Sequence, residues 1–268
     1  MKNIPGQMKR RLAFASAAVL AMSFATASKA DINVYELASE NYLGKIDLTT
    51  GAFTQITPSS NPLGLSGLAN YNGVLYGGAA NGDGLYSVNP STGLSTLVGN
   101  SSILGGYADT GSTTSGLYAL GPDSYLYSIN PNTGASTQIG DTNIPISGII
   151  GMSANGGALY ISQNSSLYQI DTSTGAATLV GTTSSARFGA MVDIGGVWYG
   201  GNFYNPPQIF TFDPTTAAVT PGAVVSGTSY PIWGLAPAPA PNPGAGLLGL
   251  GSLILAGAMT RVRGFLAR

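Results

Sequence analysis

Four aspartates lie outside the regular pattern of this sequence, and they are its clearest candidates for chemistry. They are Asp109, Asp123, Asp141 and Asp193. Two carboxyl groups roughly 5 to 10 Å apart can hydrolyse a glycosidic bond. Asp109 and Asp193 end Gly-rich segments that we expect to line the centre of the fold, so they are the candidate catalytic pair. The alternative, which we favour, is that all four are solvated turn residues.

Other catalytic and metal chemistries are limited by composition. The 268 residues include no histidine and no cysteine, which excludes Ser-His-Asp and Cys-His catalysis and His/Cys zinc sites. No Gly-rich loop joins a strand to a helix as a phosphate site requires. Calcium suits the recurring Asp and Asn side chains, but repeats spaced around a ring cannot converge on one ion. We therefore expect no cofactor and no metal.

Aromatic and amide side chains gather in the segment from Trp198 to Asn205. Rings flanked by Asn can bind sugars through stacking and amide hydrogen bonds. We take Trp198, Asn202, Tyr204 and Asn205 as the candidate ligand-binding residues, with Trp233 as a second prominent aromatic residue. The alternative is that these rings fill the space between repeats.

A five-residue phrase, Asp/Asn-x-x-Thr-Gly, recurs through the chain and indicates a repeat protein. Its copies are separated by 42, 41, 41 and 42 residues, and a fixed period of about 40 residues is typical of propeller blades. Asp or Asn can accept backbone hydrogen bonds, and Gly supplies a positive φ. The copies begin at Asp47, Asn89, Asn130, Asp171 and Asp213. The last ends in Ala217 instead of Gly, so we expect a looser or differently bulged hairpin there.

Each copy lies between two short strands, and a third strand and a Gly-rich fourth precede it. Four strands per repeat predict an all-β fold, a five-bladed β-propeller over residues 31–236. The first unit lacks its inner strand, and Tyr230–Ala236 matches that strand with nothing after it. We expect this C-terminal strand to complete the first blade and close the ring. The alternative is an open β-solenoid.

Residues 1–30 have the pattern of a secretory signal peptide. A basic segment precedes an apolar one, and small residues at Ser28 and Ala30 predict signal peptidase cleavage before Asp31. The alternatives are a membrane anchor or a buried helix. Residues 31–260 contain eleven acidic and two basic side chains. Nucleic acid is therefore not an expected partner, because phosphate binding requires clustered Lys and Arg.

The C-terminal region combines a Pro-rich spacer (237–243), an apolar segment (244–260) and a basic tail (261–268). We expect the apolar segment to form a transmembrane helix and the tail to lie in the cytoplasm. This arrangement resembles the PEP-CTERM class of sorting tail. The resemblance implies recognition by an exosortase at the inner membrane and release to the cell surface or the exopolysaccharide matrix. The Pro-Glu-Pro of that class is Pro241-Asn242-Pro243 here. The alternative is a permanent single-span anchor.

Together these features predict an exported, non-enzymatic surface or matrix protein that binds polysaccharide or another protein. A carboxylate-dependent glycoside hydrolase of the five-bladed propeller type is the alternative.

Overall fold

The computed structural model describes residues 33–38 (backbone only), 42–57, 64–148, 150–155, 157–184, 186–228 and 231–238. Ala30, Asp31, the part of the spacer after Ala238 with Pro241, Asn242 and Pro243, the predicted transmembrane segment and the basic tail lie outside these residues. Pro237, predicted as the first spacer residue, is instead the last residue of β20. In the described part of the chain, no helix has the length and hydrophobicity needed to cross a membrane.

The described chain is all-β, and four of its sheets are each built from four consecutive strands. In every such sheet neighbouring strands are antiparallel, as expected for successive hairpins. The four sheets comprise β4 (Leu65–Tyr71), β5 (Val74–Ala79), β6 (Gly84–Val88) and β7 (Ser95–Asn100); β8 (Asp109–Ser112), β9 (Leu117–Leu120), β10 (Tyr125–Ile129) and β11 (Ser136–Asp141); β12 (Ile150–Asn155), β13 (Ala158–Gln163), β14 (Ser166–Ile170) and β15 (Ala177–Thr182); and β16 (Phe188–Ile194), β17 (Val197–Asn202), β18 (Gln208–Phe212) and β19 (Val219–Val224).

The remaining sheet joins the two ends of the described chain. It has the order β20-β1-β2-β3, made of β1 (Asn33–Ala38), β2 (Leu43–Asp47), β3 (Phe53–Gln55) and β20 (Ile232–Pro237). β20 pairs antiparallel with β1, and Val34 lies opposite Pro237. The predicted pairing of the C-terminal strand with the first unit is confirmed.

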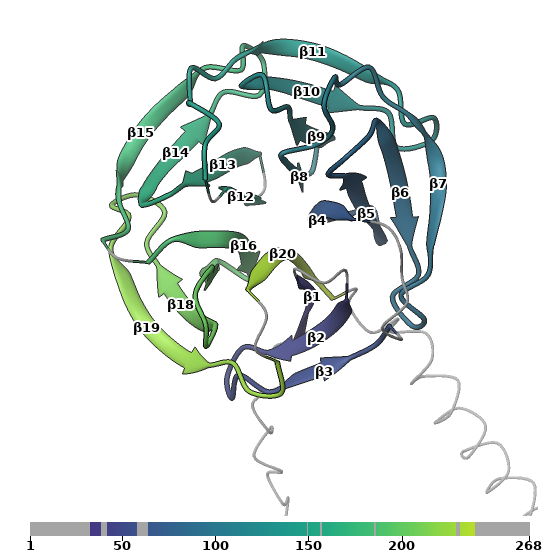
Figure 1. The fold of residues 1–268 in the computed structure, drawn as a ribbon. Coiled ribbons are helices and arrows are strands. Elements are labelled where there is room, and N and C mark those ends of the chain that lie inside the picture. Colours follow the sequence, from purple (N-terminus) through teal and green to yellow (C-terminus); the bar gives the residue numbers. More distant parts are fainter. Residues whose placement is uncertain are drawn as a thin grey trace, which may run out of the picture. The chain divides into compact units, whose positions relative to one another are not determined.

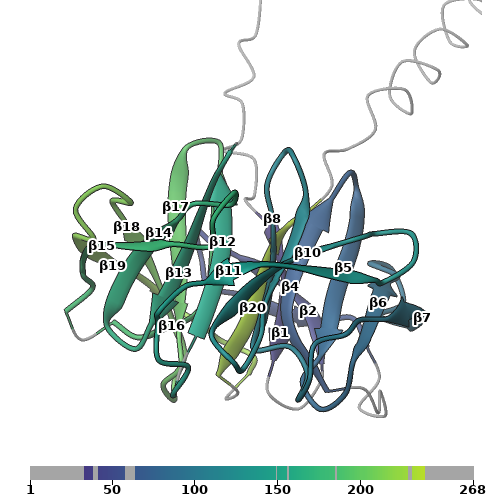
Figure 2. The ribbon, with the colours of Figure 1, turned by 90° about the horizontal axis from the view of Figure 1, so that it is seen from above.

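The sheets form a ring around a central axis, with one strand of each sheet innermost (Figure 1). These inner strands touch in a closed series, in which β4 contacts β8, β8 contacts β12, β12 contacts β16, β16 contacts β20, and β20 contacts β4. Seen from the side, the strands run from one face of the ring to the other (Figure 2). The predicted β-propeller arrangement is confirmed. The alternative of an open solenoid is wrong, because β20 contacts both β16 and β4 and so closes the series.

The axis is crowded, so inner strands approach where side chains are small. A Cβ added to Gly189 would lie 2.3 Å from the carbonyl oxygen of Ile232, and one added to Gly234 would lie 2.9 Å from the Leu68 backbone nitrogen. One inner strand lies later in the chain than the sequence pattern predicts. The Gly-rich segment Gly105–Ala108 matches the inner-strand pattern, but it forms the connection before β8, which begins at Asp109.

The repeated phrase forms the turn between the two outer strands of each sheet. In the first copy the Asp47 carboxylate accepts hydrogen bonds from the N–H groups of Thr49 and Thr50, at 2.7 and 3.2 Å. Gly51 has a φ of 75°. The phrase therefore stabilises the scaffold, as predicted from Asx-turn chemistry.

The prediction of a looser last hairpin is wrong. Ala217 adopts a φ of 60°, and its N–H bonds to the Asp213 carbonyl at 2.8 Å. Thr215 N–H still donates to the Asp213 carboxylate, at 2.7 Å. Ala tolerates the left-handed conformation at a cost of about 1 kcal/mol, and the hydrogen bonds keep it there.

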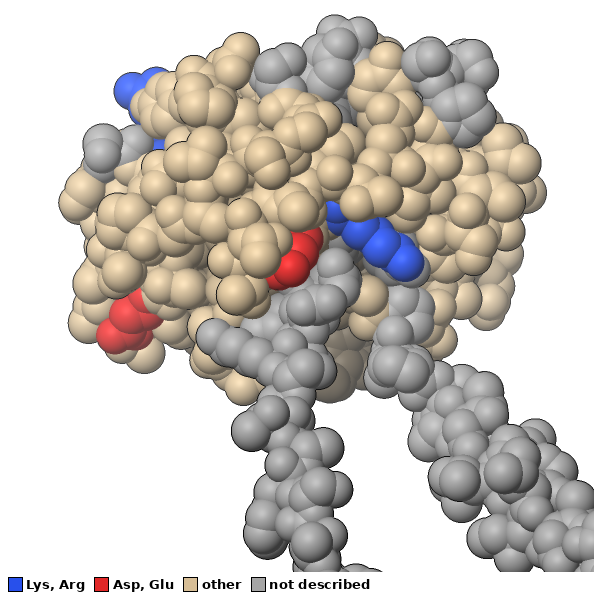
Figure 3. All heavy atoms as spheres, turned by 90° about the horizontal axis from the view of Figure 1, so that it is seen from below, with Lys and Arg blue, Asp and Glu red and all other residues tan. Residues whose placement is uncertain are grey.

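Apolar side chains fill the space between neighbouring sheets. Four tyrosines at the recurring Leu-Tyr positions are buried, as expected for packing between blades; they are Tyr76, Tyr118, Tyr127 and Tyr160. Tyr86 and Tyr168, at the same kind of position, are half-buried. Charged side chains are sparse on the surface seen in Figure 3. This face of the ring is therefore mostly neutral.

Candidate functional site

A pocket of about 420 Å³ opens at the end of the ring where the inner strands begin. We call it the Trp233 pocket. Its lining residues come from inner strands, from the connections before inner strands, and from the ends of β5 and β17, where Ala80 and Phe203 follow directly. They are Ser66, Ala80, Tyr107, Ala108, Ile146, Gly148, Ile150, Gly189, Phe203 and Trp233. A pocket on the axis is thus shared by the whole ring.

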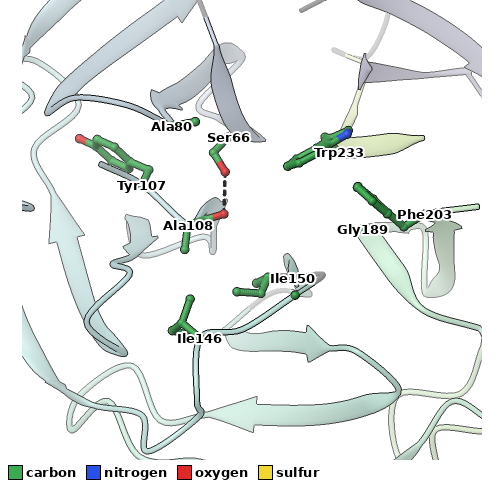
Figure 4. A pocket seen from close by; sticks show the side chains of 10 residues that line it. Ser66, Ala80, Tyr107, Ala108, Ile146, Ile150, Gly189, Phe203 and Trp233 are labelled. Carbon is green, nitrogen blue, oxygen red and sulfur yellow. Dashed lines mark hydrogen bonds between the residues drawn. The ribbon is translucent and has the colours of Figure 1, made fainter. Parts of the chain in front are cut away.

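Two aromatic rings form one wall of the Trp233 pocket. Phe203 and Trp233 meet edge to face, with ring centroids 4.9 Å apart and an interplanar angle of 69°. Both side chains point toward the centre of the ring (Figure 4). Trp233 is 38% exposed, whereas Ile232 and Leu235 on the same strand are buried. Trp233 therefore offers apolar surface that the core does not use.

The rest of the Trp233 pocket is uncharged. Ile146 and Ile150 face the aromatic pair across the pocket (Figure 4). The Ser66 hydroxyl donates to the Ala108 carbonyl at 2.6 Å. The ring of Tyr107 points away from the centre and packs against Gly78. Among the lining residues that the structure describes, none is Asp, Glu, Lys or Arg, so this part of the pocket suits a neutral ligand.

The four predicted ligand-binding residues divide into two pairs. Trp198 is 2% exposed and packs edge to face on Tyr160 at 4.9 Å. Asn202 is buried, and its side-chain oxygen accepts the Gln208 N–H at 2.7 Å. Both therefore lie in the interior and stabilise the fold.

Tyr204 and Asn205 remain on the surface. Tyr204 is 44% exposed, and the bond from Asn205 to Pro206 is cis. Both residues directly follow Phe203 in the sequence, but neither is among the described residues that line the Trp233 pocket. The sequence identified this segment, but it did not distinguish the rings that face the pocket from those in the core.

The structure does not bring the two candidate catalytic acids together. Asp109 opens β8 and does not end it, and its carboxylate lies against Gly67 of β4. Asp193 is near the end of β16 and borders a different cavity, where the inner strands end. Paired carboxylates need a shared site, so this placement does not support hydrolysis.

Asp109 is a buried carboxyl group with few partners. It is 2% exposed and accepts the Thr110 N–H at 2.6 Å. Burial raises its pKa well above the usual value, and hydrogen bonds from the Thr110 and Met152 N–H groups offset this only in part. Desolvation without a nearby cation has this effect on an acid.

In the described part of the chain, no group of three or more acidic, His or Cys side chains could hold a metal ion.

The sequence analysis did not predict that Phe203 and Trp233 are neighbours. Their proximity depends on ring closure, which places β20 beside β16.

Comparisons with known proteins identify the fold alone. No protein-family model matches the chain, and no curated protein matches it. A chain from a nidogen/laminin complex is 8% identical, with a TM-score of 0.54, and the match covers 76% of this chain and 97% of that one. A Bacteroides thetaiotaomicron protein of unknown function is 14% identical, with a TM-score of 0.55, and the match covers 78% of this chain and 62% of that one. At such identities the likeness extends to the fold and no further.

Proposed function

We propose that this protein is an exported, five-bladed β-propeller that binds a neutral ligand, such as a polysaccharide segment, in the Trp233 pocket without performing chemistry. The closed series of five inner-strand contacts supports the blade count. The exposed Trp233 ring, which contacts Phe203 in a pocket whose described lining residues are uncharged, is the observation that carries the binding role. Aromatic faces stack on the apolar faces of neutral sugars, and the uncharged lining avoids burying charge.

Tryptophan fluorescence offers a direct test, because the chain contains two tryptophans. Trp233 borders the pocket, whereas Trp198 is buried in the core. Neutral oligosaccharides added to the protein should change the emission of Trp233 in a saturable manner. The Trp233→Phe variant should lose that change, and the Trp198→Phe variant should keep it.

The matched control is Leu104→Ala, because Leu104 is 87% exposed and is not a pocket residue. It should bind as the wild type does. A neutral glycan array that stays blank for the wild-type protein would remove the polysaccharide proposal.

We also propose that the chain reaches the cell surface or an extracellular matrix through its two terminal segments. The signal pattern before Asp31 and the Pro241-Asn242-Pro243 tail with its apolar segment support this route. Signal peptidase and an exosortase are the proposed processing partners. Mass spectrometry of the mature protein from its host should find Asp31 at the N-terminus and a C-terminus upstream of Arg268. An intact Arg268 would contradict sorting and favour a permanent anchor.

A further inference from the structure

A second set of residues surrounds the axis at the end of the ring opposite the Trp233 pocket, and it shares no lining residue with that pocket. We call it the polar ring, because its side chains and backbone carbonyls form hydrogen bonds around the central channel. At this end one residue from each inner strand holds an equivalent position, and all five line a cavity of about 90 Å³. The register of four sheets shows the equivalence, because each of these residues lies opposite the first buried residue of the next strand. The pairs are Asn70 with Leu75, Ser112 with Leu117, Ala154 with Leu159, and Asp193 with Trp198. The five residues of this polar ring are Asn70, Ser112, Ala154, Asp193 and Pro237.

Two members of the polar ring follow one hydrogen-bonding rule. The Ser112 hydroxyl donates to the Asn70 carbonyl at 2.8 Å, and the Asn70 amide donates to the Pro237 carbonyl at 2.9 Å. Each side chain thus reaches the backbone carbonyl of the equivalent residue in the preceding sheet. These bonds connect neighbouring inner strands around the channel.

Asp193 cannot follow this rule as an ionised acid. Its equivalent acceptor is the carbonyl of Ala154, because Gly151 packs on Ala190 and three further residues along each strand bring Ala154 beside Asp193. One carboxylate oxygen of Asp193 is occupied by the Gly196 N–H, as Asn70 Oδ1 is by the Gly73 N–H at 3.1 Å. The other, Oδ1, is shielded from solvent and has no hydrogen-bond partner.

A carboxylate oxygen beside a carbonyl oxygen requires either a proton or a cation between them. Among the described residues that line the cavity, none is Lys or Arg. Ser112 and Ser153 add hydroxyl oxygens to its wall, and oxygen ligands suit small hard cations. The volume accommodates an ion with one or two waters, each of about 30 Å³.

We propose that the polar ring binds a small hard cation, with Asp193 Oδ1 as its charged ligand and the Ala154 carbonyl as a neutral one. The ion bridges β12 and β16 as the Asn70 amide bridges β4 and β20. Partial burial raises the pKa of Asp193, the direction expected for a carboxylate without its counter-ion. A single charged ligand implies weak binding, with a dissociation constant of about 1 mM.

The test measures thermal unfolding of the full chain after treatment with a chelator, with CaCl2, MgCl2 or NaCl added at constant ionic strength. Ca²⁺ or Mg²⁺ should raise the Tm of the wild type with a saturable, millimolar dependence. Asp193→Asn should abolish that dependence. Without added cation it should be at least as stable as the wild type, because it places at residue 193 the amide that residue 70 already uses.

Two further variants make the result decisive. Asp83→Asn removes one negative charge at an exposed loop position and should respond to the cation as the wild type does. Asp193→Ser should lose the response while folding normally, because Ser112 occupies the equivalent position. A cation response shared equally by Asp193→Asn overturns the proposal. A second result would also overturn it: the Tm of the wild type does not respond to cations, but it rises on acidification relative to that of Asp193→Asn. A proton, and not a metal ion, would then be the bridging group.

Discussion

The Asn70 side chain donates a hydrogen bond of 2.9 Å to the carbonyl oxygen of Pro237, which lies 167 residues later in the chain. The bond joins β4 to the last residue of β20, so it reinforces the contact that closes the ring. Asn70 Oδ1 meanwhile accepts the Gly73 N–H. One side chain therefore stabilises both its own hairpin and the junction with the C-terminal strand.

Asn70→Asp should weaken that junction. The carboxylate keeps the acceptor for Gly73 N–H but cannot donate to Pro237, and an unsatisfied partner costs about 1 to 3 kcal/mol. Urea unfolding should show this loss, and hydrogen exchange should show faster exchange for the β20 amides than for those of β13. Unchanged β20 protection would show that the bond does not contribute to closure.

Gly134→Ala should destabilise the protein through a collision between neighbouring sheets. Gly134 has a φ of 74°, and an added Cβ would lie 2.5 Å from the Gly99 carbonyl oxygen. Gly73 has a φ of 81° with nothing within 4 Å, so Gly73→Ala isolates the cost of backbone conformation. We expect about 1 kcal/mol for Gly73→Ala and a larger loss for Gly134→Ala, measured by urea unfolding. Equal losses would contradict close packing of the turn on the adjacent sheet.

The two tryptophans should differ sharply in their effects on stability. Trp198→Ala leaves a cavity beside Tyr160 and Phe212, and truncating a buried aromatic residue costs about 3 to 5 kcal/mol. Trp233→Ala should cost far less, because its ring is 38% exposed. Thermal unfolding of the two variants compares them directly. Equal losses would place Trp233 in the core and remove the main support for the binding site.

Asp109 should make stability depend on pH. Its pKa in the folded protein is raised, so its stabilising contribution is present below the unfolded pKa of about 3.9 and is lost as the pH rises through the folded pKa. Asp109→Asn removes this loss. The unfolding free energy of the variant minus that of the wild type should therefore increase with pH in this window. Urea titrations at a series of pH values measure the difference, and parallel curves would contradict it.

Comparing the two proteins at each pH is essential, because other acids act in the opposite direction. Hydrogen bonds from their own turns lower the pKa values of Asp171 and Asp213. Their contributions are lost as the pH falls, but both proteins share them.

Much of the fold follows from local sequence, because each repeat contains its own turn chemistry. Asp47 and Gly51 predict one hairpin, and the unmatched strand ending near Ala236 predicts its pairing with β1. The exception at Ala217 shows that turn hydrogen bonds can hold a non-glycine residue in a left-handed conformation. Local patterns thus predicted pairing well and conformational strain poorly.

The candidate site was harder to predict, because it depends on contacts between distant parts of the chain. Trp198 and Trp233 look alike in sequence, but one packs on Tyr160 and the other faces the channel. Asp109 and Asp193 both belong to inner strands, yet they occupy opposite ends of those strands. The direction of each strand and the closure of the ring decide these outcomes.

The pairing of Val34 with Pro237 also has a mechanical consequence. Because β1 and β20 are antiparallel, the start of one strand and the end of the other lie together at a single edge. Tension between these two points would load the hydrogen bonds of this pair one after another, as in unzipping, and not all at once, as in shear. The ring would then open under low force while the other four sheets stay folded.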